Sequence, residues 1–205
     1  MSIHKTDQRL PVMESFYTIQ GEGFHSGRPA WFIRLGGCDV GCVWCDVKES
    51  WDAGKHTMIA TEDLLTDALQ TPARFVVITG GEPAMYDLTG LTRLLKENGF
   101  ETAIETSGAY PLTGTWDWIC VSPKKFKSPL EEVVIQAQEL KVIISHKSDF
   151  EWAEKYAALS NENCKLYLQP EYSKFDQHIH PIIEYVKEHP EWKISLQTHK
   201  IINVP

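Results

Sequence analysis

The 205-residue sequence lacks an apolar run long enough to cross a bilayer, which takes about 18 residues or more. It also lacks an excess of positive charge, because 20 lysines and arginines against 28 aspartates and glutamates give a net charge of −8. An acidic surface disfavours nonspecific binding to nucleic acid, since the phosphate backbone repels it. The first eleven residues are polar and contain no hydrophobic core of a secretion signal. We therefore expect a cytoplasmic protein with no membrane partner and no direct nucleic-acid partner.

The sequence also lacks internal repeats, low-complexity segments and linkers. Its 42% of apolar and 23% of charged residues are ordinary values for a globular protein, which argues against a disordered or fibrous chain. The length suits one domain with a sizeable core. We therefore predict a single domain over residues 1–205.

Short β-branched or aromatic runs alternate with amphipathic stretches along the chain. The predicted strands are residues 30–35, 75–79, 102–105, 118–121, 141–144, 166–169 and 193–197. Helical patterns lie between several of them, at residues 87–98, 149–159 and 179–188 and after a candidate N-cap at Thr61. This alternation predicts an α/β fold with a mainly parallel sheet.

Polar and glycine-rich segments follow these strands directly. Examples are the Gly-Gly-Glu-Pro sequence at residues 80–83, Glu-Thr-Ser-Gly at residues 105–108 and Ser-Pro-Lys at residues 122–124. The carboxyl ends of parallel strands lie at the same edge of a sheet, and that edge carries the active site in α/β sheets and barrels. We therefore expect these segments to form one functional rim.

Three of the five cysteines, Cys38, Cys42 and Cys45, fall within eight residues. An odd number of cysteines does not suit a disulfide framework, and this crowding indicates a metal centre. Three thiolates would leave one iron of a 4Fe–4S cluster open for a ligand. The alternative is a zinc site completed by a distant histidine, Cys120 or Cys164. Cys120 lies in an apolar run and is expected to be a buried small side chain rather than a ligand.

The three cysteines followed by the glycine-rich segment at residues 80–83 resemble the radical S-adenosylmethionine (SAM) superfamily. Over residues 13–205 the chain is similar, more narrowly, to the 7-carboxy-7-deazaguanine synthases. This narrower resemblance rests on the segments at residues 18–23, 44–46, 105–108, 122–124, 168–170 and 197–200 and on Trp51.

The resemblance implies an enzyme, a lyase that converts 6-carboxy-5,6,7,8-tetrahydropterin into 7-carboxy-7-deazaguanine on the route to queuosine, with release of ammonia. It implies a 4Fe–4S cluster that cleaves SAM to a 5′-deoxyadenosyl radical, an electron donor such as flavodoxin or ferredoxin, and a homodimer. It also implies a partial, open (β/α) barrel of radical SAM type. Because a full barrel takes roughly 250 residues, we expect this barrel to have a reduced helical layer.

The family motifs assign roles to individual positions of this sequence, while the chemistry itself would be carried by SAM and the cluster. The implied cluster ligands are Cys38, Cys42 and Cys45. The implied SAM-binding residues are Trp44, Asp46, Gly81, Ser122, Lys124 and Gln169. The implied substrate-binding residues are Ile19, Gln20, Gly21, Glu22, Arg34, Thr79, His199 and Pro205.

The sequence departs from the family pattern at Val47. The family usually has a hydroxyl residue there, directly after the aspartate of the cysteine motif, and this hydroxyl helps to bind Mg²⁺. Magnesium requires oxygen ligands, and a valine side chain has none. The position therefore predicts a reduced dependence on magnesium.

Three other functions are compatible with the cysteine spacing alone. A radical SAM activase that acts on a partner protein would have no obvious use for Gln20, Glu22 and Arg34. A non-catalytic zinc-binding module would contain zinc in place of about four irons per chain. A ferredoxin-like electron carrier would normally have four cysteines in place of three.

Overall fold

Residues 8–205, which the computed structural model describes, form one nine-stranded sheet in the order β3-β1-β2-β4-β5-β6-β7-β8-β9. The first seven residues of the polar N-terminal stretch lie outside the described residues. Strand β1 pairs antiparallel with β2 and β3, and every pair from β2–β4 to β8–β9 is parallel. The strands are β1 Arg9–Ile19, β2 Pro29–Leu35, β3 Thr57–Ala60, β4 Phe75–Gly80, β5 Glu101–Thr106, β6 Trp118–Val121, β7 Glu139–Ile144, β8 Lys165–Pro170 and β9 Trp192–Ile194.

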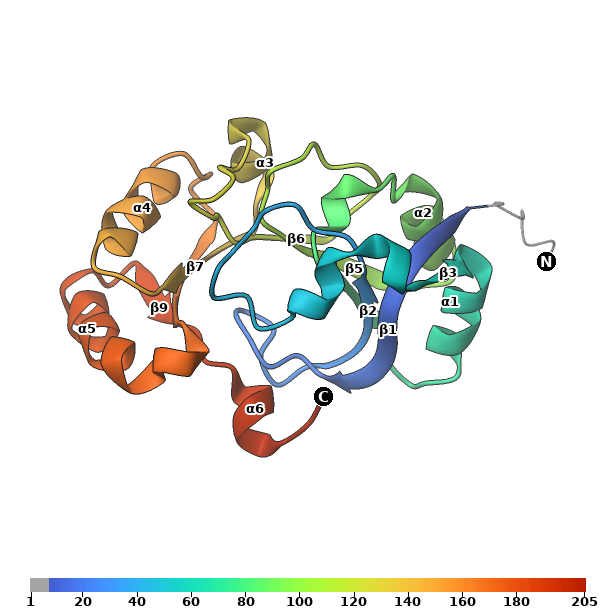
Figure 1. Cartoon of the computed structure of the whole chain (residues 1–205), viewed down its shortest axis with the longest axis horizontal. Helices are drawn as coiled ribbons and strands as arrows, with labels where there is room; N and C mark the ends of the chain where they lie inside the picture. The colour runs from blue at the N-terminus through green and yellow to red at the C-terminus, as the bar shows by residue number, and fades with distance from the viewer. Residues whose placement is uncertain (1–7) are drawn as a thin grey trace.

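The sheet curves around a central space, and helices α1 to α5 lie on its outer side (Figure 1). The loop after β2 lies across the central space, and the short helix α6 lies between α5 and β1, at the open side of the barrel. The two edge strands, β3 and β9, pair only with β1 and β8, so the barrel is open as predicted. The helices are α1 Thr61–Leu69, α2 Thr89–Glu97, α3 Glu131–Gln136, α4 Ser148–Ala157, α5 Phe175–Glu188 and α6 Thr198–Ile202.

Each of the seven predicted strands is present, with boundaries that differ by at most three residues, and residues 118–121 are predicted without error. The sequence reasoning missed β1 and β3, which extend the sheet beyond β2. The predicted cap at Thr61 is one position off, because Thr61 is the first residue of α1 and Ala60 occupies the N-cap. Helix α5 starts at Phe175, four residues before the predicted start.

Side chains alternate between the two faces of each strand, and the two faces differ in character. Outward residues such as Ile33, Ile78 and Ile104 are fully buried in the main core together with Leu91 and Leu95 of α2. Burying an aliphatic side chain of this size contributes roughly 1.5–3 kcal/mol. The same strands therefore present their other, more polar, residues to the inside of the barrel.

No helix within residues 8–205 is both long and apolar enough to span a bilayer.

Candidate active site

The inner face of the barrel and the loops at the carboxyl ends of its strands surround a cavity of about 420 Å³. Its lining comes from segments spread between Phe16 and Pro205. Every residue that the sequence analysis assigned to the cluster, SAM or the substrate belongs to this lining. These residues are Ile19, Gln20, Gly21, Glu22, Arg34, Cys38, Cys42, Trp44, Cys45, Asp46, Thr79, Gly81, Ser122, Lys124, Gln169, His199 and Pro205.

The three cysteines lie on the loop that follows β2. Gly37 N–H donates to the carbonyl of Ser50 at 2.6 Å, and Cys38 N–H donates to that of Trp51 at 3.1 Å. A tight turn brings Cys45 N–H within 3.0 Å of the carbonyl of Cys42. The loop is thus held at both ends by backbone hydrogen bonds.

The surroundings of the cysteines suit a metal cluster. Burial raises the pKa of Cys42 to about 11, and the nearby cysteines add to this while Lys124 opposes it. Burial also raises the pKa of Cys38. Bare thiolates are therefore unfavourable here, and a bound cationic centre would supply the compensating charge.

The turn formed by Gly80 and Gly81 packs directly against the start of the cysteine loop. Gly80 has φ of +145°, and a Cβ there would lie 2.2 Å from the carbonyl oxygen of Leu35. A Cβ on Gly81 would lie 2.2 Å from the carbonyl oxygen of Gly37 and 2.8 Å from Cβ of Cys38. These glycines are therefore required by the packing of the chain itself, in addition to any approach of a ligand.

Glu82 connects this turn to the loop after β5. Its side chain is 1% exposed and accepts hydrogen bonds from Thr106 Oγ1 at 2.5 Å, Ser107 N at 2.8 Å and Ala84 N at 3.0 Å. The hydroxyl of Ser107 donates to it as well. With these donors the buried carboxylate is satisfied by the protein, so its role is structural.

Trp44, Ser122 and Lys124 gather on the side of the cavity next to Cys42. The Nζ atom of Lys124 donates to the carbonyl of Ser122 at 2.8 Å and to its hydroxyl, and it lies 5.5 Å from the centre of the Trp44 ring. The neighbouring lysines differ, because Lys125 and Lys127 form ion pairs with aspartates. Lys124 is therefore the cation of this segment that faces the cavity.

Comparisons with known proteins agree with this geometry. The radical SAM superfamily matches residues 32–120. A 7-carboxy-7-deazaguanine synthase of Flavobacterium psychrophilum is 54% identical over 97% of this chain and 94% of its own length. The chain belongs to the 7-carboxy-7-deazaguanine synthase family of radical SAM enzymes.

Other members of the family match over a similar extent. The 7-carboxy-7-deazaguanine synthase of Escherichia coli K12 is 37% identical over 96% of this chain and 99% of its own length. The crystal structure of QueE from Escherichia coli superposes with a TM-score of 0.82 at 36% identity, covering 92% of this chain and 93% of that one. Membership implies a 4Fe–4S cluster and SAM as cofactors and a small-molecule substrate.

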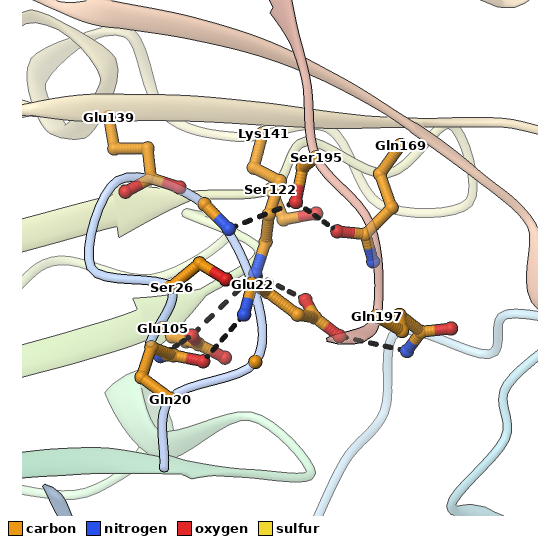
Figure 2. Close-up of polar contacts among 12 residues, drawn as sticks. Gln20, Glu22, Ser26, Glu105, Ser122, Glu139, Lys141, Gln169, Ser195 and Gln197 are labelled. Carbon is orange, nitrogen blue, oxygen red and sulfur yellow. Dashed lines mark hydrogen bonds and ion pairs between the residues drawn. The ribbon is translucent and has the colours of Figure 1, made fainter. Parts of the chain in front are cut away.

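In this member of the 7-carboxy-7-deazaguanine synthase family, the segment that the sequence analysis assigned to substrate binding follows β1. Gln20 Nε2 donates to Glu105 Oε1 at 2.9 Å, and Gln20 Oε1 accepts the N–H of Glu22 at 3.0 Å (Figure 2). The Gln20 side chain therefore connects this segment to β5.

Glu22 is the most strongly perturbed carboxylate at the site. Its Oε2 lies 2.6 Å from Lys141 Nζ, and its Oε1 accepts from Gln197 Nε2 at 2.8 Å (Figure 2). Burial alone would raise its pKa, but the charge of Lys141 and the hydrogen bonds from Lys141, Gln197 and Gln169 lower that pKa to about 2. Glu22 is thus ionised throughout the neutral range.

Sequence reasoning gave no role to Lys141. Its side chain is only 5% exposed, and Nζ also lies 3.6 Å from Glu105 Oε1. The sequence feature that could have indicated a role for Lys141 is its position in β7. Glu139, Lys141 and Ile143 share one face of this strand, while the residues between them face the core.

Arg34 and Thr79 are partners in the parallel pairing of β2 with β4. Arg34 Nε donates to Glu14 Oε1 at 2.7 Å, which is a cross-strand ion pair. The two terminal nitrogens of Arg34 have no hydrogen-bond partner within residues 8–205. The guanidinium therefore retains donors at the cavity for a ligand carboxylate.

The C-terminal segment covers the loop after β1. The N–H and hydroxyl of Thr198 both donate to the carbonyl of Gly21 at 2.9 Å. A Cβ on Gly21 would lie 2.2 Å from His199 Nδ1, so His199 packs on this glycine. Thr18 Oγ1 donates to the carbonyl oxygen of Pro205 at 3.0 Å.

Asp46 and Gln169 both line the cavity with their polar atoms already engaged. Asp46 Oδ2 lies 2.8 Å from Lys200 Nζ, which connects α6 to the cysteine loop. Gln169 Oε1 accepts from the hydroxyl of Ser195 at 2.6 Å. Val47 also lines the cavity, and its carbonyl accepts from the hydroxyl of Ser50 at 2.6 Å.

Proposed function

We propose that this chain converts 6-carboxy-5,6,7,8-tetrahydropterin into 7-carboxy-7-deazaguanine with release of ammonia, as a step in 7-deazapurine and queuosine biosynthesis. The observation that carries the proposal is the convergence of the three cysteines, the segment of Gln20 and Glu22, and Arg34 on one cavity. A binding surface for a protein substrate, as an activase needs, would not require a pocket lined by these groups. The named relatives support the same reaction.

Cys38, Cys42 and Cys45 would hold a 4Fe–4S cluster, whose open iron would bind SAM. Trp44, Asp46, Gly81, Ser122, Lys124 and Gln169 would line the SAM site. When bound, the cluster and SAM supply the radical chemistry that the side chains of the protein do not provide. The protein contributes binding, orientation and exclusion of water.

The substrate would lie between Glu22 and Arg34. Glu22 is an acceptor-only carboxylate, which suits the adjacent N–H groups of a guanidine-like ring edge. Arg34 would pair with the substrate carboxylate through its terminal nitrogens. Ile19, Gln20, Gly21, Thr79, His199 and Pro205 would complete the walls of the pocket.

The remaining family properties are part of the same proposal. We infer a weak magnesium requirement, because Val47 offers no side-chain oxygen. An electron donor such as flavodoxin or ferredoxin would reduce the cluster, and the enzyme would work as a cytoplasmic homodimer.

An anaerobic assay with reconstituted protein, SAM, a chemical reductant and the carboxy-tetrahydropterin tests the proposal. The expected result is a product with the mass of 7-carboxy-7-deazaguanine, stoichiometric ammonia and about four irons per chain. The Cys42→Ala variant should lose both iron and turnover, whereas Cys164→Ala, whose thiol is not among the cavity-lining residues, should retain both. A protein that binds iron and SAM but leaves the pterin unchanged would refute the assignment of substrate.

A further inference from the structure

Lys141 is a buried cation in the lining of the proposed substrate pocket. It projects from β7 into the barrel, with Nζ 2.6 Å from Glu22 Oε2 and 3.6 Å from Glu105 Oε1 (Figure 2). Glu22 comes from the segment after β1, and Glu105 comes from β5. One buried ammonium group therefore lies between two carboxylates from opposite parts of the chain.

The groups around Lys141 keep it protonated. Burial alone would lower its pKa, but Glu105 and Glu22, followed by Cys120 and Glu139, raise it well above the ordinary value for lysine. Lys124 and His199 also act on this group of residues, and burial lowers the pKa of each. An ammonium group held in this way is a fixed positive charge and not a proton donor near neutral pH.

Glu22 retains acceptor capacity beyond its protein partners. Lys141 binds one of its oxygens, Gln197 binds the other, and Gln169 also donates to the carboxylate, whereas a carboxylate offers about four acceptor sites in all. If Glu22 took up a proton, it would present an O–H donor to the N–H groups of a ring edge. The charge state of Glu22 thus determines whether such an edge can bind.

We propose that Lys141 is the positioning residue of the substrate pocket, which holds Glu22 ionised and oriented toward the N–H edge of the substrate. This inference rests on the proposed function, because it takes the carboxy-tetrahydropterin as the ligand. Lys141 contacts Glu22 and not the reacting atoms, so it acts on substrate affinity. It selects a ligand that donates two adjacent N–H groups over one that accepts at the same place.

The test compares Lys141→Met, which removes the charge, with Lys141→Arg, which keeps it. The wild-type KM for the pterin should be flat between about pH 6 and 9, because Glu22 titrates far below this range. In Lys141→Met the unpaired Glu22 and Glu105 repel one another, and one of them takes up a proton. Its KM should therefore be highest at low pH and fall as pH rises, with an increase of about 30-fold or more at neutral pH.

Lys141→Arg should keep the flat pH profile of KM, because the guanidinium preserves the charge. Lys165→Met is the control variant. It removes an exposed lysine at the first position of β8, away from the cavity lining, and should match the wild type in KM and kcat. Iron content and SAM binding are measured in each variant, and both should be unchanged. A flat profile in Lys141→Met with a wild-type KM would overturn the inference, while a wild type that leaves the pterin unchanged would overturn the proposed function instead.

A second comparison applies if Lys141→Met does not fold. The second comparison is made in the Glu22→Gln background, where the side chain on which Lys141 acts is already neutral. Replacing Lys141 there leaves one fewer unpaired buried carboxylate than in the Lys141→Met single variant. Adding Lys141→Met to Glu22→Gln should then change KM by no more than about threefold, since coupled residues are non-additive. A further large and pH-independent loss in the double variant would show that Lys141 does not act through Glu22.

Discussion

Single residues of this site could be predicted from the sequence where their residue type and spacing are unusual. Three cysteines within eight residues indicate a metal centre wherever they occur, and all three line the cavity. Lys141 carried no comparable signal, because a lysine within a strand is usually solvated. Its role depends on contacts with Glu22 and Glu105, which lie 119 and 36 positions before it in the sequence. The spacing of residues along the chain does not reveal tertiary contacts of this kind.

Val47 gives a prediction at the scale of one residue. Because Val47→Thr is nearly isosteric and adds an oxygen at the cavity, we expect it to increase the stimulation of turnover by Mg²⁺. Turnover and calorimetric Mg²⁺ binding in the presence of substrate measure the effect. Val47→Ala is the control, and an equal response in wild type and Val47→Thr would contradict the prediction.

At the scale of elements, the turn at residues 80–82 and the cysteine loop form one packed unit. Gly81→Ala would place a Cβ 2.2 Å from a backbone carbonyl, so one of the two loops must move. We expect a loss of roughly 1–3 kcal/mol in the free energy of unfolding and a lower iron content after reconstitution. Chemical denaturation and iron analysis measure the two effects.

Gly54→Ala is the matched control for this variant. Gly54 lies close to the same loop, and its nearest contact for an added Cβ is the flexible side chain of Asp52 at 3.2 Å. We expect nearly wild-type stability and iron content for Gly54→Ala. Equal iron loss in both variants would show that the loop does not depend on the contact of Gly81.

The strands that could be predicted from the sequence are those with a clear local pattern of residues. Buried parallel strands such as β4, with the sequence Phe-Val-Val-Ile-Thr-Gly, are continuous β-branched runs and were predicted. Strand β1 mixes exposed and buried residues and contains Pro11, and β3 is four residues long without a fully buried residue. Their pairing comes from tertiary contacts with β2 and with each other, which a short window of sequence does not contain.

On the scale of the whole molecule, one continuous core runs from Leu10 on β1 to Trp192 on β9. It includes buried residues of helices α1 to α5. We therefore expect the single domain predicted from the sequence to unfold in one cooperative transition. Tryptophan fluorescence and far-ultraviolet circular dichroism, followed against urea, should give coincident curves. Two separated transitions would indicate independently folding parts.

The open barrel also explains the size of the protein. The edge strands β3 and β9 have four and three residues, and short edges limit pairing with other chains. Within residues 8–205, nine strands and a thin outer layer of helices thus provide the inner face that the site needs.

The contact of Thr18 with Pro205 joins positions that are 187 residues apart. A contact between segments so far apart in sequence closes a long loop, so we expect this wall of the pocket to form later in folding than the locally paired strands.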